Sequence, residues 1–256
     1  MKASATILLA ALLVLAAAGA TAAVPLPATL NLEPGLVEIK ATYNGGRVLV
    51  TGTAPAGVDV VLRLTGESED TVLSKKGRVA GVLWMNTGTV TLHNAPTAYM
   101  LYLPKALSQG TEEALDALDM GYSALRRQVE VVSPGNDQDF EFHEFVRLKK
   151  RSGLYKIHPN AVEYANNGGA QSFSCGIFAP PRMHQGDYKV DAVLVRNGVV
   201  LGVLSQTLKI REKGFPALIS SLAFGHGTLY GILASLIALA AGLFMGTVFK
   251  GGKGAH

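Results

Sequence analysis

Apolar residues occupy every second position from Val37 to Tyr43, and polar or charged residues lie between them. A period of two is typical of a strand with one buried face. The segment Asn44–Gly46 tolerates positive φ, so we expect a hairpin between this strand and a second strand at Val48–Val50.

Short segments of the same kind follow, separated by Gly, Pro and Asn turns. They are predicted at Val58–Leu64, Thr71–Lys75, Arg78–Met85, Thr89–Leu92, Ala98–Leu103, Leu154–Ile157, Gln171–Phe178, Tyr188–Val195 and Val199–Ile210. Asn197-Gly198 predicts a hairpin between the last two, and Gly186-Asp187-Tyr188 resembles the corner tyrosine of immunoglobulin domains. We therefore expect a mainly β chain with an immunoglobulin-like β-sandwich, in which residues 23–107 and 153–212 form either one sandwich or two.

A helical insertion is predicted between these two sets of strands, at residues 108–152. Thr111–Val129 carries acidic residues early and arginines late, which suits the helix dipole, and its apolar residues lie on one face. A second helix is expected to end near Arg151, although Phe140–Phe142 alone could equally begin a strand.

Two apolar segments stand at the ends of the chain. Residues 1–22 combine Lys2, an apolar run and the small residues Ala20-Thr21-Ala22, which is the order of a secretory signal peptide. The apolar run is shorter than the roughly 20 residues that a bilayer core requires, so a permanent N-terminal anchor is the less favoured alternative.

The second apolar segment, residues 228–249, contains no charged residue and is long enough to span a bilayer. Lys250 and Lys253 follow it and favour a cytoplasmic tail at residues 250–256, so we expect a single-pass protein of the inner membrane whose main domain lies outside the cytoplasm. Residues 213–227 repeat apolar side chains at helical spacing, which predicts an amphipathic helix on the membrane surface.

Small residues recur every fourth position within the predicted membrane helix. They are Ala234, Ala238, Gly242 and Gly246. Such a ridge allows a second helix to approach closely, either from an integral membrane transporter or from another copy of the chain. The alternative is that glycine is simply frequent in membrane helices.

Composition and charge limit the classes of function that we expect for this chain. The 256 residues carry a formal net charge of +4, but lysine and arginine are scattered, so we expect no nucleic-acid partner. Cys175 is the single cysteine, which excludes an intramolecular disulfide. The chain contains no nucleotide-binding, hydrolase or zinc-protease motif, so we expect neither an enzyme nor a cofactor.

Three groups of side chains are candidates for a site. Trp84, Asn86 and Tyr99, with Asn94 and Pro96, are candidates for a ligand groove, although a tryptophan in the sandwich core is the simpler interpretation. Soft ligands suited to copper are Met85, Met100, Cys175, Met183 and His184. Glu141, His143 and Glu144 have metal-ligand side chains but are interpreted as exposed polar residues of a helix.

A series of short motifs also carries a family resemblance. In chain order they are Val37-Glu38-Ile39 with Tyr43-Asn44-Gly45, Trp84-Met85-Asn86, Ala95-Pro96 with Tyr99, Arg147-Leu148 with Gly153-Leu154-Tyr155, Gly186-Asp187-Tyr188, Lys213-Gly214-Phe215 and Leu229-Tyr230-Gly231. By these motifs the chain resembles the Alph_Pro_TM family of alphaproteobacterial transmembrane proteins. The resemblance implies a single-pass protein with an exported domain and a role beside a sulfite-exporter-type permease, and it supplies no catalytic residues.

The favoured hypothesis is therefore a membrane-anchored, non-enzymatic accessory protein that binds a partner or ligand beside a transporter. The alternative from another class is an exported copper-binding protein. A hydrolase would need an acid or histidine with a perturbed pKa in a cleft, which a sequence does not reveal.

Overall fold

The computed structural model describes residues 28–79, 81–108, 112–133, 137–167 and 170–249. The predicted signal peptide, residues 1–22, and the predicted tail, residues 250–256, lie outside the described residues.

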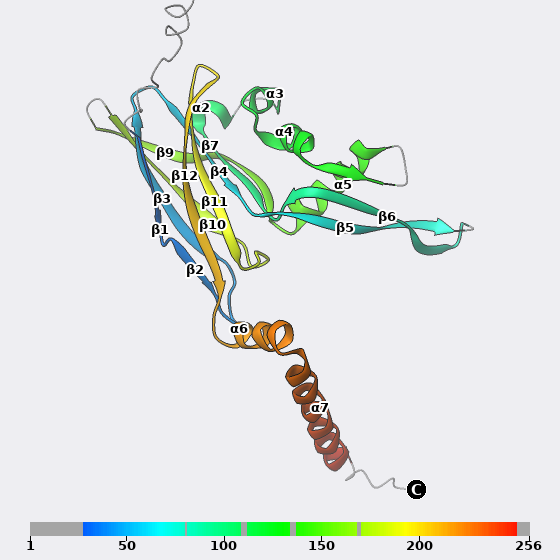
Figure 1. Cartoon of the computed structure of the whole chain (residues 1–256). Helices are drawn as coiled ribbons and strands as arrows, with labels where there is room; N and C mark the ends of the chain where they lie inside the picture. Colours follow the sequence, from blue (N-terminus) through cyan, green and yellow to red (C-terminus); the bar gives the residue numbers. More distant parts are fainter. Residues whose placement is uncertain (1–27, 80, 109–111, 134–136, 168–169, 250–256) are drawn as a thin grey trace, which may run out of the picture.

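Nine strands form one sheet that folds back on itself as a two-layered sandwich (Figure 1). The first layer holds, in spatial order, β1 (Thr29–Glu33), β3 (Gly46–Pro55), β10 (Ala170–Ala179) and β9 (Tyr155–Asn167). The second layer holds β7 (Tyr99–Pro104), β4 (Asp59–Thr65), β11 (Gly186–Arg196), β12 (Val199–Glu212) and β2 (Leu36–Ile39). These are the ABED and GFCC′ orders of immunoglobulin-like domains, which confirms the predicted fold class.

Both corners of the sandwich are closed by chain that passes from one layer to the other. Residues 163–167 of β9 pair with β10, whereas residues 155–158 and Val162 pair with β7. At the other corner β1 pairs with β3, and β2, which follows at once, pairs with β12. Strands from before and after the helical segment are direct neighbours, as in β3 with β10 and β4 with β11, so the chain forms one sandwich.

Tyr188 fixes the start of β11 as the corner-tyrosine pattern predicts. Its hydroxyl donates a hydrogen bond to the carbonyl oxygen of His184, 2.9 Å away. Between the layers, large buried side chains such as Tyr102, Phe173 and Leu62 fill the core. The Asn197-Gly198 hairpin between β11 and β12 is also confirmed, and both residues adopt positive φ.

A long hairpin, here called the arm, projects from the sandwich (Figure 1). It consists of β5 (Ser68–Val79) and β6 (Leu83–Pro96), and near its base the short strand β8 (Glu130–Val132) pairs with residues 91–93 of β6. The predicted single strand Arg78–Met85 is wrong, because Gly81, at φ +74°, and Val82 form the turn at the end of the arm.

The helical segment covers the outer face of the second layer (Figure 1). It contains α2 (Lys105–Ser108), α3 (Glu112–Asp116), α4 (Gly121–Gln128) and α5 (Gln138–Arg151). The backbone N–H of Gly121 donates to the hydroxyl of Tyr99 at 3.1 Å. Leu115 and Leu125 of this helical segment, here called the cover, are buried. The predicted single helix Thr111–Val129 is wrong, because a turn with Asp119 at φ +54° divides it; Phe140–Phe142 is helical.

The hairpin predicted across Asn44–Gly46 is also wrong. β2 ends at Ile39 and pairs in parallel with β12, while β3 pairs with β1 and β10. The alternating pattern identified the strand but not its neighbour, because the pattern reports only which face is buried.

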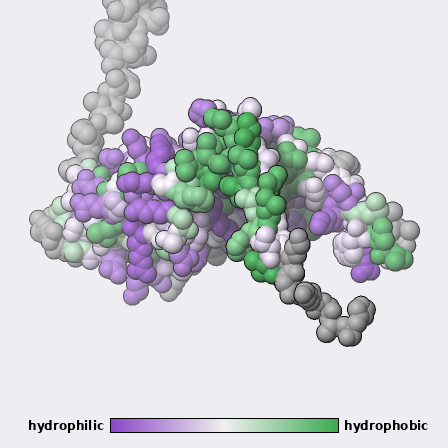
Figure 2. All heavy atoms as spheres, turned by 90° about the horizontal axis from the view of Figure 1, so that it is seen from below, coloured by the Kyte–Doolittle hydropathy of each residue, from purple (hydrophilic) through white to green (hydrophobic). Residues whose placement is uncertain are grey.

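The chain ends in a connected set of apolar helices. α6 (Phe215–Ser220) continues into a π-helical turn, η1 (Ser221–Gly225), and α7 (Gly227–Phe249) follows with 23 residues. Every residue of α7 is exposed, and no other described helix is both long and apolar enough to cross a membrane. Figure 2 shows apolar atoms gathered over this end of the molecule, in contrast to the polar surface of the sandwich.

Replacing Tyr188 by Phe removes the corner hydrogen bond but keeps the ring in place. We expect the free energy of unfolding to fall by about 1 kcal/mol, measured by circular dichroism during urea unfolding of the full chain in mild detergent. Tyr122→Phe is the matched control, because no hydrogen bond of its hydroxyl is found in the described structure. Equal stability losses in both variants would contradict the role assigned to Tyr188.

Candidate functional site

A polar cleft lies where the arm leaves the sandwich. It has a volume of about 290 Å³ and is enclosed by the outer face of the second layer, the base of the arm and the cover of α4. Its polar lining includes Arg63, Lys189 and Asp191 from the sheet, Asn94 from the arm, and Asp119 and Gln128 from the cover. Arg63 and Asp191 are register partners on β4 and β11, so the sheet itself places their side chains on one face.

Asp191 is the most deeply buried charged group of the cleft, with 1% of the residue exposed. Arg63 donates to Oδ2 of Asp191 from Nη2 at 2.9 Å and from Nε at 3.3 Å, and the hydroxyl of Ser205 donates to Oδ1 at 2.6 Å. Burial acts to raise the pKa of Asp191, but these hydrogen bonds and the charges of Arg63 and Lys189 outweigh it, so the pKa is lowered.

The remaining charges give the cleft a mixed character. Lys189 is half exposed and lies 3.3 Å from Oδ1 of Asp191, and Asp119 is held by Arg127 at 2.9 Å on the opposite wall. The lining thus offers two cations and two carboxylates. Such a cleft suits a polar or zwitterionic group, and Asp191 is poorly suited to accept a proton near neutral pH because it is ion-paired and its pKa is low.

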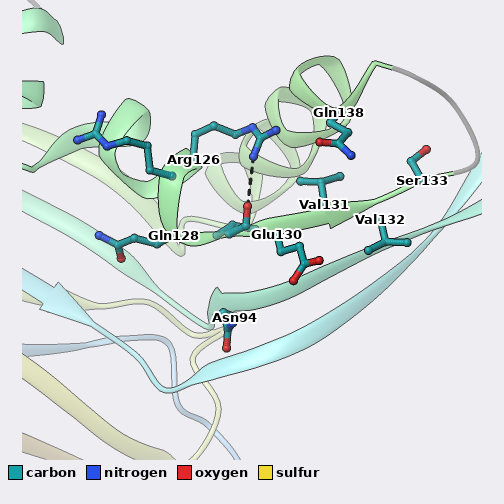
Figure 3. Close-up of a pocket in the computed structure, with 10 residues that line it drawn as sticks. Asn94, Arg126, Gln128, Glu130, Val131, Val132, Ser133 and Gln138 are labelled. Atoms are coloured by element: carbon teal, nitrogen blue, oxygen red, sulfur yellow. Dashed lines mark hydrogen bonds between the residues drawn. The ribbon is translucent and has the colours of Figure 1, made fainter.

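A shallower groove of about 570 Å³ adjoins the cleft and shares Asn94 and Gln128 with it. Figure 3 shows its walls, formed by α4, β8, the start of α5 and the facing part of β6. Arg126 is fixed in the wall, since it donates to the carbonyl oxygen of Val129 at 3.2 Å and to Asp139 at 2.9 Å. Arg126 in this wall is therefore already hydrogen-bonded, as are Arg63 and Asp191 in the cleft.

The structure divides the predicted groove residues between two places. Trp84 and Asn86 lie near the far end of the arm, and 65% of Trp84 is exposed, so a tryptophan in the sandwich core is wrong. Tyr99 is buried at the start of β7, just after the other end of β6, and lines the polar cleft with Asn94 and Pro96. A 14-residue strand separates the two ends by roughly 45 Å.

The predicted copper ligands are likewise not gathered. Met85 lies near the end of the arm, whereas Met100 and Cys175 are buried in the sandwich, where burial raises the pKa of the Cys175 thiol to about 12. His184 lines a separate hollow beside Tyr188, while the neighbouring Met183 is buried. Among the described residues, no three His, Cys, Asp or Glu side chains are grouped as metal ligands.

The polar side chains on α5 also point to different partners. Glu141, expected to be exposed, is buried and forms an ion pair with Lys75 of the arm at 2.5 Å. His143 lies 2.7 Å from the carbonyl oxygen of Asp139, and Glu144 pairs with Arg147. These contacts tie α5 to the arm and to itself.

The small-residue ridge, Ala234, Ala238, Gly242 and Gly246, lies along exposed α7. A Cβ atom added at Gly242 or Gly246 would meet nothing within 4 Å. The ridge as a helix-packing surface therefore stays a prediction, and a larger side chain there fits the isolated chain.

Sequence reasoning missed Arg63 and Asp191. The available signal was a single charged residue within each of two apolar strands, Val60–Leu64 and Val190–Val195. A charge in such a strand requires a partner, but only the register of β4 and β11 identifies it.

Asp191→Asn is expected to lower the free energy of unfolding at pH 7 by roughly 1–3 kcal/mol, because it weakens a buried, hydrogen-bonded ion pair. The lowered pKa means that the stabilisation is complete above the unfolded pKa of about 4 and is lost as pH falls through the folded pKa. The difference between wild type and variant should therefore shrink at pH 3, measured by circular dichroism.

The matched control is Asp187→Asn, which breaks the exposed pair with Arg211. An exposed pair contributes less than about 1 kcal/mol, so its loss should be smaller at pH 7. An Asp191 variant as stable as wild type at pH 7 would refute the assignment.

A known protein family matches most of the chain. A family model described as "Putative transmembrane protein (Alph_Pro_TM)" matches residues 29–251. Among curated proteins, none matches the chain. The match begins at β1, includes the sandwich, the arm and the helical cover, and extends through α7. The protein therefore belongs to the Alph_Pro_TM family.

Proposed function

We propose that this protein is a non-enzymatic accessory protein that binds a partner or ligand beside an integral membrane transporter, such as a sulfite-exporter-type permease. The observation that carries the proposal is the state of α7, which is apolar along its length and entirely exposed. Lipid would cover most of this surface, and the Gly242 and Gly246 side leaves room for a second helix.

The sandwich supports a binding role rather than catalysis. Its polar cleft is lined by charges that are already paired, which favours recognition of a polar group over proton transfer. The cleft and the arm belong to the part of the protein that would face a neighbouring protein's extramembrane surface.

The proposal includes an orientation. Residues 1–22 would direct export, and Lys250 and Lys253 would hold the short tail in the cytoplasm, so that the sandwich lies outside the inner membrane.

A reporter that is active only in the cytoplasm tests this orientation. Fused after His256 it should be active in cells, whereas fused after Lys213, in a chain without α6 and α7, it should be exported and inactive. Activity of the second fusion, or inactivity of the first with normal protein levels, would contradict the orientation.

Gly242→Leu tests whether a partner helix packs against this side of α7. The larger side chain fits the isolated helix but would fill the space that a second helix needs. We expect wild type, extracted in mild detergent and examined by native mass spectrometry, to carry a membrane protein that the variant loses. Ala240→Leu, on the opposite face of α7, should retain it. A strictly monomeric wild type without a companion would remove the basis of the proposal.

A further inference from the structure

The end of the arm is the most exposed apolar segment of the molecule outside the C-terminal helices. We call Val82, Leu83, Trp84 and Met85 the arm tip; their exposed fractions are 82%, 60%, 65% and 47%. Four consecutive apolar side chains in water are unusual at a hairpin end, where polar turn residues are the norm. In Figure 2, apolar atoms are visible at the end of the arm from the side on which α7 lies.

The charges next to the arm tip have one sign. Between Thr71 and Leu92 the chain carries three cations and no acidic residue. Lys75 is neutralised by Glu141, but Lys76 and Arg78 form no ion pair with any described residue. The Arg78 guanidinium lies 5.2 Å from the centroid of the Trp84 ring, so an aromatic ring and a cation are presented together.

The position of the arm relative to the membrane helix limits what it can reach. In Figure 1, α7 slants away beneath the sandwich on the side to which the arm extends. α6 and η1, which connect the sandwich to α7, expose further apolar side chains; 66% of Phe215 and 92% of Phe224 are exposed. Glycines stand at the joints, Gly214 before α6 and Gly225 and Gly227 on either side of His226. An α7 held in the bilayer would tether the sandwich to it, so the arm tip would encounter the bilayer surface at a high effective concentration.

We propose that the arm tip is a second membrane contact, which inserts into the interface of the bilayer that holds α7 and binds anionic phospholipid. Tryptophan favours the headgroup level, where its ring is partly apolar and its N–H remains hydrated. Val82, Leu83 and Met85 enter the acyl boundary, and Lys76 and Arg78 face lipid phosphates. The inference depends on α7 being in a membrane and not on any transporter.

Trp84 is the only tryptophan in the chain, so intrinsic fluorescence reports on the arm tip alone. The full chain is reconstituted into vesicles of phosphatidylcholine, with and without phosphatidylglycerol, and compared with the same protein in detergent. We expect the emission of Trp84 to shift to shorter wavelength in the anionic vesicles and to be quenched by brominated acyl chains, more strongly than in neutral vesicles.

Two variants serve as controls. With Val199→Trp in a Trp84→Phe background, the sole tryptophan moves to the hairpin between β11 and β12, far from α7 in Figure 1, and should not be quenched. Lys76→Gln with Arg78→Gln should remove the difference between anionic and neutral vesicles. Lys156→Gln, an exposed cation outside the arm, should leave it unchanged.

Three results would overturn the inference. The first is unshifted, unquenched Trp84 emission in both kinds of vesicle. The second is a shift that depends on protein concentration and occurs without lipid quenching, which would assign the arm tip to a second copy or another protein. The third is equal quenching in both vesicles, which would remove the role of anionic lipid.

Discussion

In β7, β4 and β11 the second layer of the sandwich is apolar on both faces, and the rest of the structure depends on keeping water from both. Its inner face packs against the first layer, while Val61, Leu101 and Val193 on the outer face are buried as well. A sheet covered on one side only would leave these residues in water. The segment between β7 and β9 supplies the missing layer, and its length also allows those two strands to pair in parallel.

The cover is smaller than the face it protects, and this sets the position of the polar cleft. Where the cover ends, Arg63 and Asp191 replace apolar residues in the same register and neutralise one another. The arm leaves the sandwich at this boundary, anchored by β8 and by the pair between Lys75 and Glu141. The cleft is thus the junction of three parts of the fold, and the charged side chains in its walls are already ion-paired.

Local pattern predicted much of this fold, and distance along the chain explains what it did not predict. Alternation located most strands, and Tyr188 and the Asn197-Gly198 turn were identified because their chemistry is local. The partner of β2 and the pairing of Arg63 with Asp191 depend on contacts between distant segments. The turn that divides the predicted helix near Asp119 is local, but the charge and apolar pattern used for the helix does not report it. Trp84 was misplaced for a related reason, since an apolar residue in a strand normally indicates a core, and only the projecting arm shows otherwise.

The exposed state of the arm tip has no explanation within the folded chain. The distal part of a two-stranded ribbon gains little stability from its own pairing, and polar residues at the turn would avoid the cost of hydrating Val82 and Leu83. Arg78 covers part of the Trp84 ring but leaves 65% of that residue exposed. In the proposed membrane contact, burial at the bilayer interface would compensate this cost. A protein surface would have to be matched in shape to the arm tip, whereas a bilayer that holds α7 would accept any apolar side chain flanked by cations.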